Sequence, residues 1–156
     1  MFIRVKFLFD SMLTKTGRMF RIMGYDVKIA MSSSKDEEIL EEAKRENRIL
    51  VTRDKSLYRK SILHGLKVIY SPHSDQYSIL RDIAHSLGIK LRIDLSKTRC
   101  ARCNQPLKVR LKEEIPVEDR KLIPEGYWTV FYCCRCRRPY WLGSHYSTLI
   151  KILDIT

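Results

Sequence analysis

Four cysteines of the sequence fall into two pairs whose spacing is typical of a metal site. Cys100 and Cys103 form one C-x2-C pair, and Cys133 and Cys136 form a second. Between the two pairs lie 29 residues. Two intervening residues let the chain turn so that both sulfurs face one ion, and four thiolates complete a closed tetrahedral Zn²⁺ site. Such a zinc holds structure, because no coordination position stays open. The alternative is a pair of disulfides, and Cys134, which breaks the spacing, is interpreted as a non-ligand.

Three aspartates, Asp10, Asp36 and Asp54, each follow an expected strand, at or near its carboxyl end. In an open parallel sheet these ends point to the same side, where such folds bind ligands. Three carboxylates gathered there repel one another unless a cation lies between them. Mg²⁺ or Mn²⁺, held by carboxylates and waters, is the natural occupant and supports hydrolysis of a phosphodiester bond.

Each of these acids also has an interpretation without a metal. Asp36 lies in the first turn of an expected helix, where an acid favours the helix dipole. Asp54 can cap the next helix. Asp10 directly follows an almost continuous apolar run and has no comparably clear cap sequence. Asp75 is interpreted as a first-turn acid of a later helix or as a fourth residue of the site.

Short strands and helices alternate in the first part of the chain. Strands are expected over 3–9, 25–30, 48–52 and 66–70. Helices are expected over 11–23, after a capping box at 34–37, after Asp54 through Leu63, and from a cap at Ser74 to the glycine at 88. Alternation of this kind predicts right-handed crossovers and a parallel sheet with helices on both faces. The predicted fold class is therefore α/β.

The composition changes after this first part. All five cysteines and both tryptophans lie after position 96, and 11 basic residues face five acidic ones between Lys97 and Arg138. We expect a first domain over 1–95, a cysteine ribbon over 96–143, and a helix over 144–156 that packs back on the first domain. The net charge of +12 indicates a polyanionic partner, RNA or DNA. No run approaches the ~18 apolar residues of a membrane span and no signal peptide is visible, so a cytoplasmic protein is expected.

Several segments together resemble one known family. They are Phe9–Leu13, Arg18–Asp26, the Asp36-Glu37-Glu38-Ile-Leu segment, Arg48–Asp54 with its Thr-Arg-Asp end, the two cysteine pairs, and Tyr140-Trp141-Leu-Gly143-Ser144-His145. In this order they resemble the Mut-seven C-terminal ribonuclease family, whose members are PIN-like domains with a zinc ribbon near the carboxyl end. One departure stands at 14–17, where Thr-Lys-Thr-Gly replaces the family's usual Gly-Lys-Leu-Ala-like stretch and removes apolar bulk from a helix.

The resemblance implies a PIN-type nuclease in which Asp10, Asp36 and Asp54 bind Mg²⁺ or Mn²⁺ and cut single-stranded RNA. Basic residues near these acids, Arg18, Arg21 and Arg53, are expected to contact phosphate or to pair with the acids. In the ribbon, basic and aromatic side chains can bind RNA or form a solvated face over packed rings. This ribbon set is Arg99, Arg102, Lys108, Arg110, Lys112, Arg135, Arg137 and Arg138 with Tyr127, Trp128 and Tyr132.

Three functions remain open at this point. The first is a metal-dependent endoribonuclease whose ribbon assists RNA binding. The second is a non-catalytic RNA-binding or ribosome-associated factor, with ribosomal RNA as its partner. A DNA-binding regulator is the third, although the sequence has no helix-turn-helix or basic-helix pattern. Tyr140 and Trp141 are expected to form a seam between ribbon and first domain, and His145 is expected to pack or cap, or to reach the acids.

Overall fold

The structure is a computed structural model that describes residues 5–155 and the side chains of 5–153. Its first part is a sheet of four parallel strands in the order β2-β1-β3-β4. The strands are β1 (Lys6–Phe9), β2 (Asp26–Ile29), β3 (Ile49–Thr52) and β4 (Val68–Tyr70). Phe7 lies between Val27 of β2 and Ile49 of β3, which fixes the register of the central strand. The predicted α/β class with a parallel sheet is confirmed.

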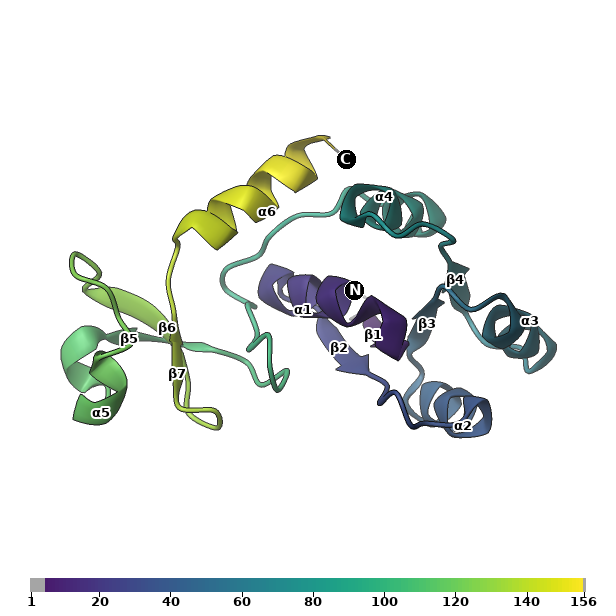
Figure 1. Ribbon diagram of the computed structural model, residues 1–156, viewed down its shortest axis with the longest axis horizontal. Helices are drawn as coiled ribbons and strands as arrows, with labels where there is room; N and C mark the ends of the chain where they lie inside the picture. The colour runs from purple at the N-terminus through teal and green to yellow at the C-terminus, as the bar shows by residue number, and fades with distance from the viewer. Residues whose placement is uncertain (1–4, 156) are drawn as a thin grey trace.

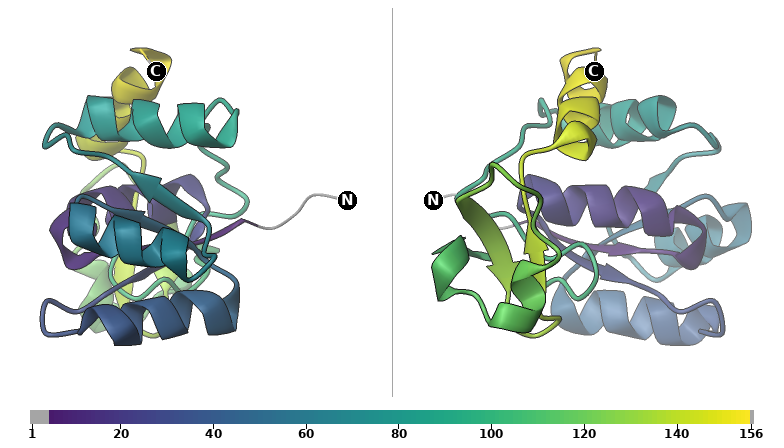
Figure 2. Two further views of the ribbon diagram at one scale, coloured as in Figure 1. Left: turned by 90° about the vertical axis from the view of Figure 1, so that its right-hand side faces the viewer. Right: turned by 60° about the vertical axis from the view of Figure 1, so that its left-hand side comes forward.

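Helices cover both faces of this sheet, as Figures 1 and 2 show. They are α1 (Thr14–Met23), α2 (Asp36–Glu46), α3 (Lys55–Leu63) and α4 (Gln76–Leu87). Phe7 and Phe9 pack with α1 and α4 on one face, whereas Leu8 and Leu50 pack with α2 and α3 on the other. Side chains of a strand alternate between faces, so a nearly continuous apolar strand supplies both layers of the core.

The first helix approaches the sheet closely where the sequence departs from the family's usual pattern. A 3₁₀ turn over Ser11–Leu13 leads into α1, where Thr16 and Gly17 are buried. A Cβ atom on Gly17 would lie 3.0 Å from two carbons of Ile29, so glycine lets α1 pack against β2. The Thr16 hydroxyl donates a hydrogen bond to the Gln76 amide oxygen of α4 at 3.1 Å. Thr16 and Gly17 are therefore well packed, and larger side chains at these positions would not improve the packing of α1.

A second, smaller sheet lies beside the first (Figure 1). It is antiparallel in the order β5-β6-β7 and consists of β5 (Lys108–Leu111), β6 (Thr129–Cys133) and β7 (Arg138–Tyr140), with α5 (Val117–Arg120) in the β5–β6 connection. Ile115, Ile123, Val130 and Tyr132 form its small core. A core of this size needs a further source of stability.

The last helix, α6 (Ser144–Ile155), runs from the second sheet toward α4 (Figure 1). Its Leu149 and Leu153 are buried in the same apolar cluster as Ile79 and Ile83 of α4, which ties the end of the chain to the first sheet. Within the described residues, no helix has the length and apolar character needed to cross a membrane.

Helix starts differ from expectation by one residue at two places. The cap of α2 is Lys35 rather than Ser34, and the Glu38 carboxylate, not that of Glu37, accepts from the Lys35 N–H at 3.0 Å. The cap of α4 is Asp75 rather than Ser74, because its carboxylate accepts from Ser78 N–H at 2.8 Å. The strands are also shorter than predicted, and Ile3 and Arg4 of the first expected strand lie outside the described residues.

The close approach of α1 generates a prediction about stability. Gly17→Val should lower the free energy of unfolding by about 1–3 kcal/mol, because the new side chain overlaps Ile29 in a packed core. Lys15→Val places the same side chain on the exposed face of the same helix and controls for the intrinsic helix propensity of valine. Urea denaturation of both variants measures the difference, and equal losses would contradict the packing role of Gly17.

Candidate functional site

The strand order creates a switch point between β1 and β3. The chain moves from β1 to β2 on one side of the sheet and then returns to place β3 and β4 on the other side. Open α/β sheets bind ligands at such a point, outside the carboxyl ends of the strands. Asp10 directly follows β1, and its N–H donates to the Val51 carbonyl of β3 at 3.0 Å. Thr52, Arg53 and Asp54 lie at the end of β3, so both sides of the switch point carry polar residues.

Asp10 is buried and held by three donors. Its Oδ1 accepts from the Met12 N–H at 2.6 Å, and its Oδ2 accepts from the Arg53 N–H at 3.1 Å and from the hydroxyl of Thr52, a residue with no exposed surface. A carboxylate has about four lone-pair sites, so three donors leave capacity for a further bond. The Asp10 carboxylate is therefore fixed in direction and not saturated.

Asp54 is joined to Asp10 through the same threonine. The Thr52 hydroxyl accepts from the Asp54 N–H at 2.9 Å while it donates to Asp10. The Oδ1 of Asp54 caps α3 by accepting from Ser56 N–H at 2.7 Å and Leu57 N–H at 3.1 Å. In the part of the chain that the structure describes, Oδ2 makes no hydrogen bond. The capping role foreseen for Asp54 is observed and leaves one oxygen exposed to other partners.

Asp36 is paired with a lysine that sequence reasoning did not single out. The Lys60 ammonium of α3 lies 2.7 Å from Asp36 Oδ2 and 3.8 Å from Glu37 Oε1. Its pKa is raised, first by the hydrogen bond to Asp36 and further by the charges of Asp36, Glu37 and Asp54. A cationic side chain of the protein itself thus lies near the acids of α2 and Asp54.

The aspartates do not form a tight metal cage in this conformation. Among the described residues, the cysteine quartet is the group of three or more potential ligands whose ligand atoms all lie within 4.8 Å of one another. Asp75 is an exposed helix cap beyond β4, and backbone and hydroxyl hydrogen bonds from Ser78 lower its pKa. The structure therefore groups Asp10 with Asp54, pairs Asp36 with Lys60, and places Asp75 at a helix start.

Arg53 and Arg18 differ in their surroundings. The Nε atom of Arg53, which follows Thr52, is buried and has no hydrogen-bond partner among the described residues. A buried donor without a partner costs free energy, so an acceptor from a ligand would be favourable there. Arg18 is an exposed residue of α1.

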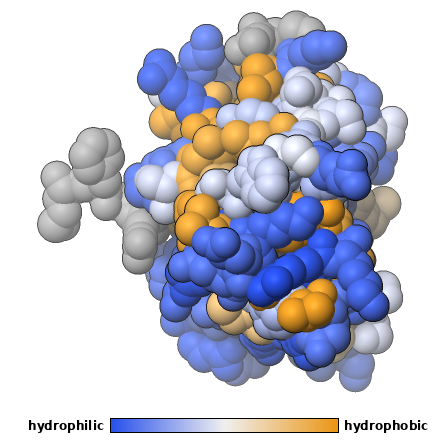
Figure 3. Space-filling model, turned by 90° about the vertical axis from the view of Figure 1, so that its left-hand side faces the viewer, coloured by the Kyte–Doolittle hydropathy of each residue, from blue (hydrophilic) through white to orange (hydrophobic). Residues whose placement is uncertain are grey.

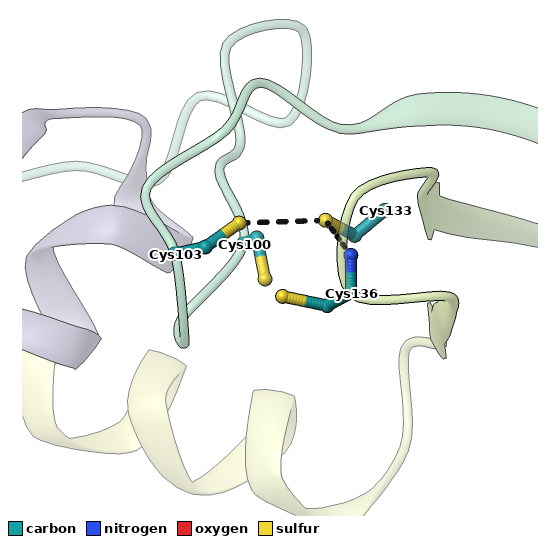
Figure 4. A group of neighbouring side chains, drawn as sticks. All are labelled: Cys100, Cys103, Cys133 and Cys136. Atoms are coloured by element: carbon teal, nitrogen blue, oxygen red, sulfur yellow. Dashed lines mark hydrogen bonds between the residues drawn. The ribbon is translucent and has the colours of Figure 1, made fainter.

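The four predicted cysteines converge on one point, as Figure 4 shows. Their sulfurs all lie within 4.8 Å of one another, and Cys103 Sγ is 3.6 Å from Cys133 Sγ. Tetrahedral zinc with Zn–S bonds of about 2.3 Å places neighbouring sulfurs about 3.8 Å apart. The five cysteines are free thiols, and Cys134 is exposed and outside the group. The quartet can bind a structural metal such as zinc.

The turns of both cysteine pairs have the geometry that such a site needs. The Cys136 N–H donates to Cys133 Sγ at 3.4 Å, within the second C-x2-C turn. Burial raises the pKa of Cys133 to about 12 and also raises that of Cys136. Burial acts in the same direction on Cys100, but hydrogen bonds from the Tyr140 hydroxyl and from backbone N–H groups outweigh it and lower that pKa to about 7. Metal must displace protons from these thiols, so its affinity falls as the pH falls.

The first cysteine turn is fastened to the parallel sheet by polar groups. Arg21 of α1 is buried, and its Nε donates to the Val27 carbonyl at 2.9 Å while Nη1 donates to the carbonyls of Ala101 at 2.9 Å and Arg102 at 3.1 Å. Asn104 accepts from the Val27 N–H at 3.0 Å and donates to Asp26 at 2.8 Å. The backbone of Asn104 has a φ of 66°, a left-handed conformation that asparagine tolerates.

This placement changes the interpretation of Arg21. It lies beneath the metal-binding turn instead of on a surface that faces RNA, and the charges of Cys100 and Cys103 act on it. A zinc ion with four thiolates carries about −2, so the guanidinium is also a counter-charge. We assign Arg21 to the positioning of the ribbon and no longer to RNA contact.

The arginines of the ribbon divide into two groups. Arg102, Arg135 and Arg138 are exposed. Arg137 pairs with Glu118 and Asp119, with N–O distances of 3.1 Å to each. Tyr132, expected as a stacking platform, is buried and donates its hydroxyl to Asp119 at 2.6 Å, whereas Trp128 is 76% exposed. Figure 3 shows the ribbon side of the molecule as mostly hydrophilic with separate apolar patches.

These features define a class of protein. A small parallel α/β domain with acidic side chains at its switch point is joined to a ribbon with four clustered cysteines that can bind a metal. The family model described as Mut7-C RNAse domain matches residues 5–153, and the chain belongs to this family, which confirms the resemblance. A ribonuclease domain implies RNA as the substrate. No curated protein and no solved structure matches the chain significantly.

Sequence reasoning missed two residues with clear roles. Lys60 lies on a different element from Asp36, and only the packing of α3 beside α2 brings them together. Thr52 belongs to the Thr-Arg-Asp segment, but no local pattern indicates that its hydroxyl joins Asp10 to Asp54. Its position as the last residue of a buried strand was the available signal.

The contacts of Arg21 generate a prediction. Arg21→Met should lower the free energy of unfolding by about 2–4 kcal/mol, because three buried or half-buried carbonyls lose their donor. Arg18→Met, one turn earlier on the exposed side of α1, should change it by less than about 0.5 kcal/mol. Urea denaturation of the metal-loaded proteins measures both values. A similar small loss for both variants would show that Arg21 does not fasten the ribbon.

Proposed function

We propose that the protein is a metal-dependent endoribonuclease that hydrolyses RNA phosphodiester bonds at the switch point of its parallel sheet. The observation that carries this proposal is the pair of carboxylates of Asp10 and Asp54, linked through the Thr52 hydroxyl, each with an oxygen able to take a further partner. Asp36 completes the acid site once it leaves Lys60. The proposed metal is Mg²⁺ or Mn²⁺.

The residues fit such an ion by their chemistry. Mg²⁺ binds proteins through one or two carboxylates and keeps several waters, so the site does not need three ligand atoms in close contact. Lys60 supports the proposal as well. Its ammonium lies near Asp36, Glu37 and Asp54, so the carboxylates there attract a positive charge. A bound divalent cation supplies activation of the attacking water and neutralisation of the phosphate charge.

The protein's own residues have separate roles in this proposal. Thr52 and the N–H groups of Met12 and Arg53 hold the Asp10 carboxylate toward the site. Arg53 follows Thr52 and is half-buried, and in this proposal its guanidinium binds an oxygen of the scissile phosphate. Hydrolysis joins a water oxygen to phosphorus and breaks the bond to the RNA 3′-oxygen, which leaves with a proton.

The ribbon is proposed to hold zinc and to assist RNA binding. Arg102, Arg135 and Arg138 are exposed and available to phosphates, with exposed Arg18 on α1 as a further contact. Arg137 instead forms ion pairs with Glu118 and Asp119 within the ribbon. Phosphate contacts of this kind strengthen binding without selecting a sequence.

Removal of one ligand tests the zinc proposal. Cys103→Ser and Cys136→Ser should lose the metal and unfold the ribbon, because structural zinc supplies on the order of 10 kcal/mol to such small units. Cys134→Ser, an exposed neighbour of the second pair, should keep both metal and fold. Elemental analysis of freshly purified protein should find one zinc per chain in the wild type and in Cys134→Ser. Absence of zinc from both would contradict the proposal.

Substitution of the acids tests the activity. Asp10→Asn and Asp54→Asn should slow cleavage of a labelled single-stranded RNA in Mn²⁺ by at least about 100-fold, because a ligand worth several kcal/mol in the transition state is lost. Asparagine also caps helices well, so Asp54→Asn keeps the start of α3. Asp75→Asn is the matched control, since Asp75 caps α4 away from the switch point.

Two results would overturn the catalytic assignment. Equal cleavage by wild type and Asp54→Asn would place the reaction elsewhere or in a contaminant. RNA binding by all forms without cleavage by any would favour the alternative, a non-catalytic RNA-binding or ribosome-associated factor.

A further inference from the structure

A pocket of about 340 Å³ lies where the ribbon, the start of α6 and the end of α1 meet. Ile22 of α1 and Leu149 of α6 belong to its lining, as do Thr98 and Arg99 ahead of the first cysteine pair. All six residues of the Tyr140–His145 segment also line it. That segment carries part of the resemblance to the family, yet the acid site uses none of its residues.

The lining has the chemistry of a base-binding site. It contains the four aromatic side chains of Phe131, Tyr140, Trp141 and Tyr146, and among the described residues it contains no aspartate or glutamate. Aromatic side chains stack on bases of unpaired nucleic acid regardless of sequence. The volume falls in the lower part of the range of about 300–1,000 Å³ that small-molecule pockets occupy.

One positive side chain and the start of a helix accompany the aromatic side chains. Arg99 lines the pocket, and one of its Nη atoms is fixed by the Asn104 carbonyl at 2.8 Å. Ser144, His145 and Tyr146 come from the first turn of α6, which has no acidic residue. The start of a helix favours negative charge, so a phosphate attached to a bound base is favoured at this side of the pocket.

We infer that this pocket binds one unstacked nucleotide of single-stranded RNA, with its base against the aromatic side chains and its phosphate toward Arg99 and the start of α6. The inference rests on the proposed function for RNA as the ligand, but it does not depend on cleavage. An apolar molecule without charge would make no use of Arg99 or of the absence of acids.

The position of the pocket separates this nucleotide from the scissile bond. Asp10 precedes the start of α1, whereas Ile22 lies at its end, and a ten-residue helix is about 15 Å long. The bound nucleotide is therefore displaced along the strand from the cleavage site and is not its direct neighbour. A base held at a fixed distance sets where the strand is cut relative to that base.

One residue of the pocket wall contacts the cysteine quartet. The Tyr140 hydroxyl contacts Cys100 Sγ at 3.0 Å, so a pocket residue touches a metal-binding residue directly. Trp141 packs beside Tyr127 with 6.1 Å between ring centroids. At Gly143 a Cβ atom would lie 3.0 Å from Trp141 Nε1, so glycine at this position leaves room for the indole.

Fluorescence of Trp141 tests the inference directly. The chain has two tryptophans, and Trp128 does not line this pocket, so Trp128→Phe leaves Trp141 as the single tryptophan. In a Trp128→Phe, Asp54→Asn protein, titration with a labelled single-stranded 12-nucleotide RNA should quench Trp141 with the same midpoint that anisotropy of the RNA label reports. One abasic position in the RNA should weaken binding about 5- to 100-fold and remove the quenching.

Tyr146→Leu completes a thermodynamic cycle with the abasic RNA. Leucine keeps an apolar side chain in α6 and removes the aromatic face, so the variant should bind intact RNA about 5- to 100-fold more weakly. With the abasic RNA the same substitution should have little further effect, because both changes remove the same contact between the base and Tyr146. Circular dichroism and retained zinc confirm that the variant is folded.

Three results would overturn the inference. They are RNA binding without a change in Trp141 emission, equal effects of abasic sites at all positions, and absence of RNA binding at low salt. Failure of the proposed function is a different result, because cleavage plays no part in this assay. Quenching of Trp141 together with an inactive wild type would keep the nucleotide pocket and reject the nuclease, and the reverse would keep the nuclease alone.

Discussion

The arrangement of the molecule depends on one buried cation, the guanidinium of Arg21. The ribbon has only a small core of its own, and the contacts of its first cysteine turn with the parallel sheet are polar. Arg21 connects the carbonyls of the first cysteine turn to that of Val27, and Asn104 adds hydrogen bonds to the start of β2. Since a buried charge must be paired, these partners fix the first cysteine pair in position and orientation.

The two features that we propose to contact RNA lie at opposite ends of α1. The acids lie at the carboxyl ends of the strands because strand order creates a switch point there. The ribbon docks at the other end of the helix, where β2 begins, and encloses the aromatic pocket together with α6. Substrate that uses both must extend along the protein. In the proposed function, exposed arginines of the ribbon add sequence-independent attraction for phosphate.

Much of the fold could be predicted because local signals agreed with the tertiary structure. The C-x2-C spacing defines the cysteine site, and alternating strands and helices define the parallel sheet. Asp10 could be placed because it ends a buried strand. Arg21 was expected beside the acids because it is near Asp10 in sequence, but α1 carries it to the far end of the sheet. Lys60 could not be paired with Asp36 without knowledge of how α2 and α3 pack, and a pocket formed by three distant segments has no local signal.

The central claim is that Asp10 and Asp54 form the core of a cation site at the switch point. A crystal of the protein soaked in Mn²⁺ tests this most directly, because anomalous scattering locates manganese independently of activity. The account predicts a manganese peak within bonding distance of Asp10 and Asp54, with the Asp36 carboxylate released from Lys60 and turned toward the ion. Manganese absent from these carboxylates, with Asp36 still paired to Lys60, would contradict it.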